Sequence, residues 1–161
     1  MKQKALKKMW RAIPWEHLFT KHWRIYIVHF QNFNQIQLPI QLKENQFLTG
    51  VATSAPFANL ELIAGRLSLI NRIESILASE DVTRHKPDPE VYLKSAANLQ
   101  IEPDFCVVFE DSFSGVTAAK NAGMKVVGVL SSHSRSELPV CDLYIDDFRK
   151  MDADKVLALI Y

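Results

Sequence analysis

The chain has 161 residues, of which 48% are hydrophobic and 23% charged, and its formal net charge is +1. A chain of this length can bury the core of one domain, and its composition excludes extended disorder. Its two cysteines exclude a disulfide scaffold, and no apolar run approaches the ~20 residues of a membrane-spanning helix. We therefore expect a cytoplasmic protein without a membrane partner, because no apolar core follows the basic amino end as in a secretory signal.

Charge and residue type divide the chain into two parts. Residues 1–50 carry eight Lys/Arg and two acidic residues, a net charge of +6, so the remaining residues carry −5. All three tryptophans lie in the first 23 residues, whereas the first aspartate is Asp81. We interpret residues 1–42 as an atypical basic and aromatic segment, and residues 43–161 as an α/β core.

The amino-terminal segment shows little regular pattern. Residues 3–12 fit a basic helix and residues 24–30 (RIYIVHF) alternate as in a strand, but residues 31–41 have no clear period. Basic residues with interleaved aromatics can bind nucleic acid. Here the cations are spread over 43 residues and no nucleic-acid motif is present, so we expect no nucleic-acid partner.

From about residue 46 onward, short apolar runs alternate with helical patterns, which is typical of a parallel α/β sheet. Residues 73–78 fit either a strand or the end of a helix. Asp88-Pro89 is a favourable helix start, and Gly123 is placed to end a helix. Strands are predicted at residues 47–53, 105–109, 125–130 and 143–145, and helices at 58–69, 88–99, 114–122 and 153–160.

Polar residues with anion-binding chemistry come directly after the first of these strands and before the second helix. Ligands of open parallel sheets bind beyond the carboxyl ends of the strands. The Thr53 hydroxyl and the N–H groups of the turn at Ser54 can hold a phosphate or carboxylate oxygen, although a plain turn is the alternative. Lys86 stands before two prolines that restrict its backbone and can aim its ammonium at an anion. The alternative for Lys86 is a solvated loop lysine.

Two adjacent acids, Glu110 and Asp111, follow the apolar run 105–109 (FCVVF). Crowded carboxylates need a cation or hydrogen-bond donors to stay ionised, and Mg²⁺ prefers carboxylate oxygens. The alternative is a capping role, because Asp111 and Ser112 precede a predicted helix. In contrast, we interpret the pair Asp146-Asp147 as a solvated turn.

Three ordered segments carry a family resemblance. GVATSAPFANLELI (50–63), DVTRHKPDPEVYLKSAANL (81–99) and CVVFEDSFSGVTAAKNAGMKVVGV (106–129) resemble the second, third and fourth motifs of the haloacid dehalogenase-like (HAD) superfamily. The similarity extends from about Lys43 to the end, and it points to the β-phosphoglucomutase-like branch of sugar-phosphate phosphatases and mutases. The resemblance implies a Rossmann-like core and Mg²⁺-dependent chemistry on a small phosphorylated metabolite such as a sugar phosphate, or binding of inorganic phosphate.

The resemblance also implies roles for individual residues. Thr53 matches the hydroxyl that binds the transferring phosphoryl group, with the Ser54 N–H beside it. Lys86 matches the lysine that offsets charge on the phosphate and the nucleophile, so that Thr53 and Lys86 are the expected catalytic residues. Glu110 and Asp111 match the acids that position Mg²⁺, with Asp111 as the expected direct ligand. The resemblance thus implies that these residues together form a phosphoryl-transfer site.

The first motif of the family is missing from this sequence. The family carries a D-x-D-G-[TV] motif near its amino end, whose first aspartate attacks phosphorus, but residues 1–80 contain no aspartate. The resemblance further implies a helical cap after the first strand, for which we expect no room in this chain. We therefore expect a core that is incomplete at its amino end, as from a truncated or frame-shifted gene, and little or no phosphatase activity from this chain alone.

Two alternatives to an inactive enzyme follow from the same gap. The chain could be a non-catalytic protein that binds phosphate and Mg²⁺ or a partner on a HAD fold. It could also pair through an exposed sheet edge with a polypeptide that supplies the first strand, which would make an oligomer. Whether residues 24–30 take the place of that strand is left open by the sequence.

Overall fold

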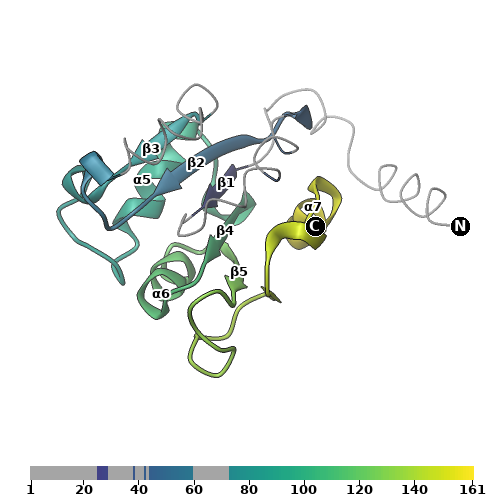
Figure 1. The fold of residues 1–161 in the computed structure, drawn as a ribbon. Coiled ribbons are helices and arrows are strands. Elements are labelled where there is room, and N and C mark those ends of the chain that lie inside the picture. Colours follow the sequence, from purple (N-terminus) through teal and green to yellow (C-terminus); the bar gives the residue numbers. More distant parts are fainter. Residues whose placement is uncertain (1–24, 29–37, 39–41, 43, 60–72) are drawn as a thin grey trace, which may run out of the picture.

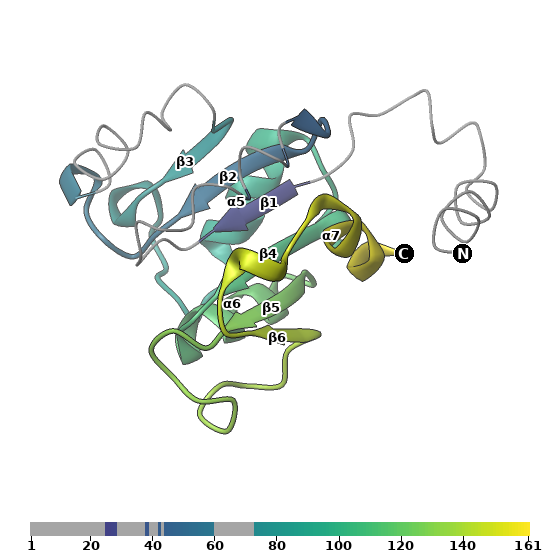
Figure 2. The ribbon, with the colours of Figure 1, turned by 45° about the vertical axis from the view of Figure 1, so that its right-hand side comes forward.

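The structure is a computed structural model that describes residues 25–28, 38, 42, 44–59 and 73–161. Its centre is a sheet of six parallel strands in the order β3-β2-β1-β4-β5-β6 (Figures 1 and 2). The strands are β1 (Ile25–Val28), β2 (Leu48–Ala52), β3 (Ser75–Leu77), β4 (Cys106–Glu110), β5 (Lys125–Val129) and β6 (Leu143–Ile145). This is the strand order of the doubly wound nucleotide-binding folds, and it confirms the predicted Rossmann-like α/β class.

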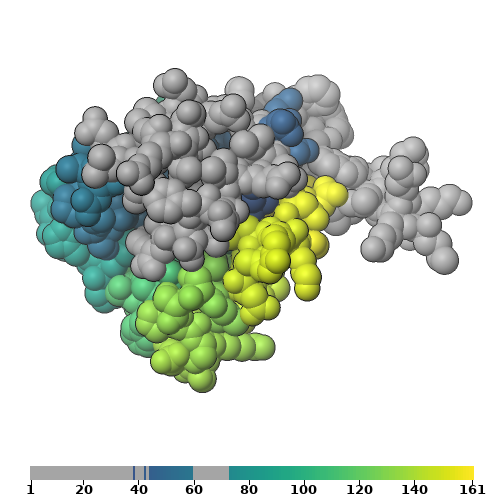
Figure 3. Space-filling model, in the orientation of Figure 1, coloured from purple at the N-terminus to yellow at the C-terminus, as the bar shows by residue number. Residues whose placement is uncertain are grey.

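Helices cover both faces of the sheet, as the apolar strands require. The α-helices that the structure describes in full are α5 (Glu90–Leu99), α6 (Phe113–Asn121) and α7 (Ala153–Ile160). Short 3₁₀ turns occupy Ser79–Asp81, Pro103–Phe105 and Phe148–Lys150. On the face shown in Figure 3, α7 (yellow) and the largely exposed segment between β5 and β6 (yellow-green) form part of the surface. None of the described helices is long and apolar enough to cross a bilayer.

Alternate residues of β4 enter two separate hydrophobic clusters. Cys106 and Val108 pack with apolar residues of α5 and α6, whereas Val107 and Phe109 pack in a second cluster that includes Val156 of α7. The ring of Phe109 also stacks on Phe148, with 5.3 Å between ring centroids. Burial on both faces explains why this strand is a continuous apolar run, as in other parallel sheets.

β1 lies in the middle of the sheet, although it precedes the predicted boundary between residues 42 and 43. It pairs with β2 through Ile25↔Leu48 and with β4 through Ile25↔Cys106. The chain itself therefore supplies the strand between β2 and β4, and no partner strand is needed there. The described sheet has β3 and β6 as its edges, and pairing through an edge stays a prediction, as does the domain boundary.

Most predicted elements are confirmed within the described residues. Residues 73–78, whose pattern fitted either a strand or the end of a helix, contain strand β3. The predicted helix at 58–69 is described only at its start, where residues 57–59 are helical; the patterns at 3–12 and 31–41 lie outside the described residues. Gly123 ends α6 with a φ of +76°, a left-handed conformation that glycine adopts without strain.

The start of α5 differs slightly from the expectation. The cap position is Pro89, rather than Asp88, and the Asp88 carboxylate instead accepts a hydrogen bond from the N–H of Glu90 at 3.0 Å. The aspartate therefore satisfies a free N–H of the first turn from one position further out.

Candidate functional site

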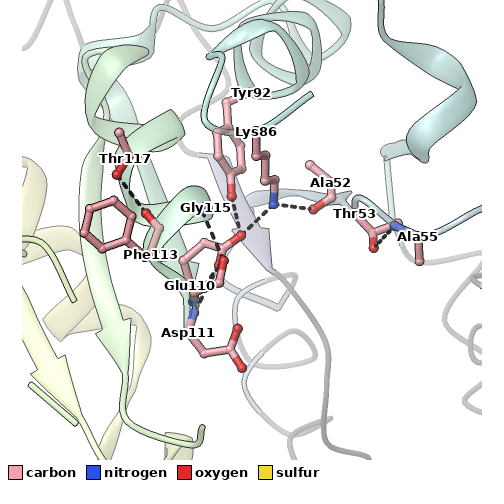
Figure 4. A network of polar contacts seen from close by, with 11 residues as sticks. Ala52, Thr53, Ala55, Lys86, Tyr92, Glu110, Asp111, Phe113, Gly115 and Thr117 are labelled. Carbon is pink, nitrogen blue, oxygen red and sulfur yellow. Dashed lines mark hydrogen bonds and ion pairs between the residues drawn. The ribbon is translucent and has the colours of Figure 1, made fainter. Parts of the chain in front are cut away.

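The candidate site lies at the carboxyl edge of the sheet, where the strand order reverses between β1 and β4. Open α/β sheets bind ligands at this switch point. β4 ends with Glu110 and is followed by Asp111, while β2 is followed by Thr53. Lys86 comes from the loop that precedes α5, and Figure 4 shows its side chain pointing toward Glu110, with Asp111 beside Glu110 and Thr53 beyond Ala52. The parallel sheet thus brings together four of the residues that the sequence singled out.

The Glu110 carboxylate is buried and held by donors from three elements. Oε1 accepts hydrogen bonds from Lys86 Nζ at 2.6 Å and from the Tyr92 hydroxyl at 2.7 Å. Oε2 accepts from the N–H groups of Asp111 and Ser112 at 3.1 and 3.2 Å, and from the Ser112 hydroxyl at 3.0 Å. With a side-chain exposure of 0%, this ion is stable only because a cation and several donors surround it.

Lys86 is a buried cation that joins two strand ends. Its side chain is 4% exposed, so the alternative of a solvated loop lysine is wrong. Besides the ion pair with Glu110, its Nζ donates to the carbonyl of Ala52 at 3.3 Å and lies 4.7 Å from the ring centroid of Tyr92. The ammonium therefore stands between the ends of β2 and β4 (Figure 4).

The loop that carries Lys86 is fastened to α5 by Glu90. The Glu90 carboxylate accepts from the N–H groups of Thr83 and Arg84, both at 2.9 Å. The hydrogen bond from the Thr83 N–H is the main cause that lowers the pKa of Glu90 from 4.5 to about 2. Sequence reasoning missed this residue, because its only signal was an acid in the first turn of a helix, where any acid is favourable.

Tyr92, on the buried face of α5, completes the surroundings of Glu110. Its complete burial raises the pKa of the phenol, and the negative charge of Glu110 raises it further. The hydroxyl therefore stays protonated and acts as a donor to the carboxylate. Sequence reasoning missed Tyr92, although a tyrosine among the apolar residues of a buried helix face usually needs a partner for its hydroxyl.

Gly115, in the first turn of α6, allows the helix to approach the Glu110 carboxylate. A Cβ on Gly115 would lie 2.0 Å from Glu110 Cδ and 2.1 and 2.2 Å from its two oxygens. No side chain fits at that separation, and the sequence indicated only a helix start at this position. Ser112 caps the helix, with its hydroxyl accepting from the Gly115 N–H at 3.1 Å.

The two carboxylate oxygens of Asp111 differ in their partners: one accepts from serine hydroxyls, and the other has no hydrogen-bond partner among the described residues. The residue is 4% exposed, and its Oδ2 accepts from the hydroxyls of Ser131 and Ser132, each at 3.0 Å. Its Oδ1 is buried and has no hydrogen-bond partner among the described residues. Ser112, rather than Asp111, caps α6, so the capping alternative applies only to the serine.

An orphaned carboxylate oxygen at this position fits a ligand for a divalent cation, because such cations take oxygen donors. The oxygens of Glu110, in contrast, are already engaged by Lys86, Tyr92 and the start of α6. Within the part of the chain that the structure describes, no group of three or more His, Cys, Asp or Glu could hold a metal ion. The predicted metal roles of Glu110 and Asp111 stay predictions, and the geometry favours Asp111.

Thr53 and Ser54 form a turn beyond β2. The Thr53 hydroxyl oxygen accepts from the Ala55 N–H at 3.0 Å, and the Thr53 N–H donates to the Leu77 carbonyl at 3.0 Å. Thr53 is half-buried and Ser54 is exposed. The turn that the sequence left as an alternative is therefore present, and the binding of phosphate by these two residues stays a prediction.

Asp146, Asp147 and Cys106 lie outside this cluster, and their surroundings do not indicate a catalytic role. Asp147 caps a short turn by accepting from the Arg149 N–H at 2.9 Å, and Asp146 is exposed. Burial is the main cause that raises the pKa of Cys106 to about 12, so the thiol is not a nucleophile at neutral pH. The site chemistry therefore rests on the carboxyl edge around Glu110.

The chain is similar to curated enzymes, among them a phosphatase and a phosphoglucomutase. The chain is 33% identical over 116 residues to validoxylamine A 7′-phosphate phosphatase from Streptomyces hygroscopicus subsp. limoneus, which covers 72% of this chain and 54% of the relative. It is 37% identical over 93 residues to β-phosphoglucomutase from Bacillus subtilis (strain 168), covering 58% of this chain and 40% of the relative. The chain thus spans about half the length of these curated relatives.

A solved structure shares the fold. The crystal structure of a HAD hydrolase of family IA, variant 3, from Entamoeba histolytica HM-1:IMSS superposes with a TM-score of 0.69 at 26% sequence identity, covering 76% of this chain and 57% of the other. The family model matches the chain from residue 7, whereas the motif resemblance found in the sequence began only at about Lys43. Because the model of the haloacid dehalogenase-like hydrolases matches residues 7–129, which is more than half of the sequence, the chain belongs to that family.

Proposed function

We propose that this chain binds the phosphoryl group of a small phosphorylated metabolite, such as a sugar phosphate, at the carboxyl edge of its sheet. One observation carries the proposal: the buried cation of Lys86 and the unpartnered carboxylate oxygen of Asp111 lie at the switch point of a Rossmann-like sheet. Relatives named as a phosphatase of validoxylamine A 7′-phosphate and as β-phosphoglucomutase support a phosphorylated substrate.

Each residue has a distinct part in this proposal. The Lys86 ammonium attracts the phosphate oxygens, and its ion pair with Glu110 fixes its position. The Thr53 hydroxyl and the Ser54 N–H, at the end of β2, orient the phosphoryl group. Asp111 would hold Mg²⁺ through its open Oδ1. When bound, the ion stabilises negative charge that spreads over the phosphate oxygens.

We further propose that the site binds without efficient turnover. In the sequence, the last residue of β1 is followed by His29, and the first aspartate is Asp81. The family resemblance places an attacking aspartate after the first strand, and this chain has no carboxylate there. Charge stabilisation and orientation are then present, but the group that would form the covalent phospho-intermediate is not.

Ligand-dependent stability tests the binding part. We expect the thermal unfolding midpoint of the full chain to rise when MgCl₂ and inorganic phosphate are added together. A ligand at 100 times its dissociation constant stabilises by about 2.7 kcal/mol. Lys86→Met should abolish the phosphate-dependent rise, whereas Lys94→Met, a change at an exposed lysine of α5, should retain it. No rise in the wild type, or an equal rise in Lys86→Met, contradicts phosphate binding at this site.

An aryl phosphate assay with Mg²⁺ tests the absence of turnover. We expect no phosphatase activity above the uncatalysed rate, because no nucleophile is available. Activity that disappears in both Lys86→Ala and Asp111→Ala would show that another residue attacks phosphorus, and the proposal of binding without turnover would then be wrong. Activity that persists in both variants would indicate a contaminating enzyme, which a second purification scheme removes.

A further inference from the structure

We propose that Ser131, Ser132 and His133, here called the 131–133 clamp, hold Asp111 so that its Oδ1 alone is left without a hydrogen-bond donor and can take a cation. The clamp follows β5, which lies beside β4 with Glu110 opposite Gly128. Parallel neighbours end at the same edge of the sheet, so the segment after β5 reaches the residue after β4. The inference rests on the proposed function, because it concerns how the proposed ligand to the metal is positioned.

The clamp bonds two different atoms of Asp111. The hydroxyls of Ser131 and Ser132 both donate to Oδ2 at 3.0 Å. His133 Nδ1 lies 2.8 Å from the main-chain carbonyl oxygen of Asp111, and because that oxygen can only accept, Nδ1 carries the proton of this bond. The Ser132 hydroxyl also lies 3.3 Å from His133 Nδ1, which links neighbouring members of the clamp.

These bonds leave Asp111 with little freedom. Its N–H donates to Glu110 Oε2 at 3.1 Å, its carbonyl oxygen is engaged by His133, and its Oδ2 accepts two hydroxyl donors. Hydrogen bonds to a carboxylate are stronger than bonds between neutral groups. Rotation of the carboxylate would break both serine bonds, so the clamp selects one rotamer and therefore one open oxygen.

Both serine hydroxyls donate to the same oxygen of Asp111. This arrangement indicates that they position the carboxylate, rather than only stabilise its buried charge. Donors shared between both oxygens would satisfy the charge equally well, but here Oδ1 is left buried without a partner among the described residues. An unpaired buried oxygen costs free energy, and a bound cation removes that cost. Groups that orient a ligand in this way are positioning residues, and their loss typically weakens metal binding about 10- to 100-fold.

Mn²⁺ binding to the full chain, followed by electron paramagnetic resonance, measures the effect without any enzymatic assay. We expect Ser131→Ala/Ser132→Ala to raise the Kd for Mn²⁺ about 10- to 100-fold. The matched control is Ser134→Ala/Ser136→Ala in the same segment, since those hydroxyls bond to each other and to Glu137 rather than to Asp111. The control should retain the wild-type Kd. An unchanged Kd in the clamp variant, with Asp111→Ala abolishing binding, overturns the proposal.

A double-mutant cycle on the metal-free protein separates the clamp from the proposed function. Urea unfolding in EDTA is measured for Asp111→Ala, for Ser131→Ala/Ser132→Ala and for their combination. We expect the combined loss of stability to be smaller than the sum of the two separate losses, because both changes remove the same bonds. Additive losses overturn the clamp whether or not Mn²⁺ binds. Coupled losses in a wild-type chain that binds no Mn²⁺ keep the clamp and refute the metal role of Asp111 in the proposed function.

Discussion

Substituting Gly115 by alanine tests the packing of α6 against the central carboxylate. The new Cβ would lie 2.0 Å from Glu110 Cδ, so either the carboxylate or the start of the helix has to move. Movement of the carboxylate breaks bonds that Lys86, Tyr92 and Ser112 donate to it. A hydrogen bond to a charged group contributes about 1.5–3 kcal/mol, so the loss of two of them costs about 3–6 kcal/mol.

Part of that cost is offset, because alanine is the better helix former. Replacing glycine by alanine inside a helix gains about 1 kcal/mol, which leaves a net destabilisation of about 2–5 kcal/mol. For a chain of this size, 1 kcal/mol corresponds to about 2–4 °C in the unfolding midpoint, so a loss of 3 kcal/mol lowers the midpoint by about 6–12 °C. Urea denaturation and thermal unfolding both measure this difference.

A control substitution at the neighbouring residue of α6 separates the effect of the close contact with Glu110 from the effect of alanine on helix stability. Ser114→Ala lies one position earlier on α6 and should change stability by less than about 0.5 kcal/mol, as is usual for sites away from such features. If Gly115→Ala is as stable as Ser114→Ala, the close approach between α6 and Glu110 does not exist in solution. Glu110 would then not be confined by α6, and its carboxylate would have a different arrangement from the one described above.

Three further predictions concern the hydroxyl of Tyr92, the carboxylate of Glu90 and the thiol of Cys106. Tyr92→Phe removes a donor to Glu110 while keeping the ring, so urea unfolding should show a loss of about 1.5–3 kcal/mol, and an unchanged stability would contradict the bond. The pKa of Glu90 is lowered to about 2, chiefly by the Thr83 N–H, so its contribution is complete above about pH 4.5 and lost as the pH falls toward 2. The stability difference between wild type and Glu90→Gln should therefore shrink over that range in acid titrations, and a constant difference would refute the cause. Burial raises the pKa of Cys106 to about 12, so a thiol reagent at neutral pH should label it only after unfolding, which peptide mass spectrometry can check.

Sequence patterns predicted individual strands well where the side chains on both faces of the strand are buried. Residues 106–109 of β4 and 126–129 of β5 are buried, so each stretch appears as an apolar run with the residue types of a central strand. The alternation in residues 24–30 likewise indicated a strand, and Ile25–Val28 forms one. The pattern could not show that this strand lies between β2 and β4, because strand pairing depends on backbone hydrogen bonds that any strand can offer to any other.

The candidate site was predictable to the extent that its residue types have chemistry of their own. Lys86, Glu110 and Asp111 are charged residues next to apolar runs or prolines, and such positions indicate an edge of a sheet. Tyr92 and Gly115 were missed, because a tyrosine on a helix and a glycine in a helical turn are common in any protein. Their importance comes from contacts with Glu110, which lies 18 and 5 positions away in the chain.

The sequence by itself determined the fold class, the strand ends that carry polar groups, and the absence of aspartate from residues 1–80. These features depend on local composition and spacing, which act before any distant contact forms. Only the tertiary structure decided that Lys86 forms an ion pair with Glu110, and that one oxygen of Asp111 has no hydrogen-bond partner among the described residues. The physical reason is that a buried charge is stable only beside opposite charges or hydrogen-bonding partners, and the packing of the strands and helices sets which partners lie close to it.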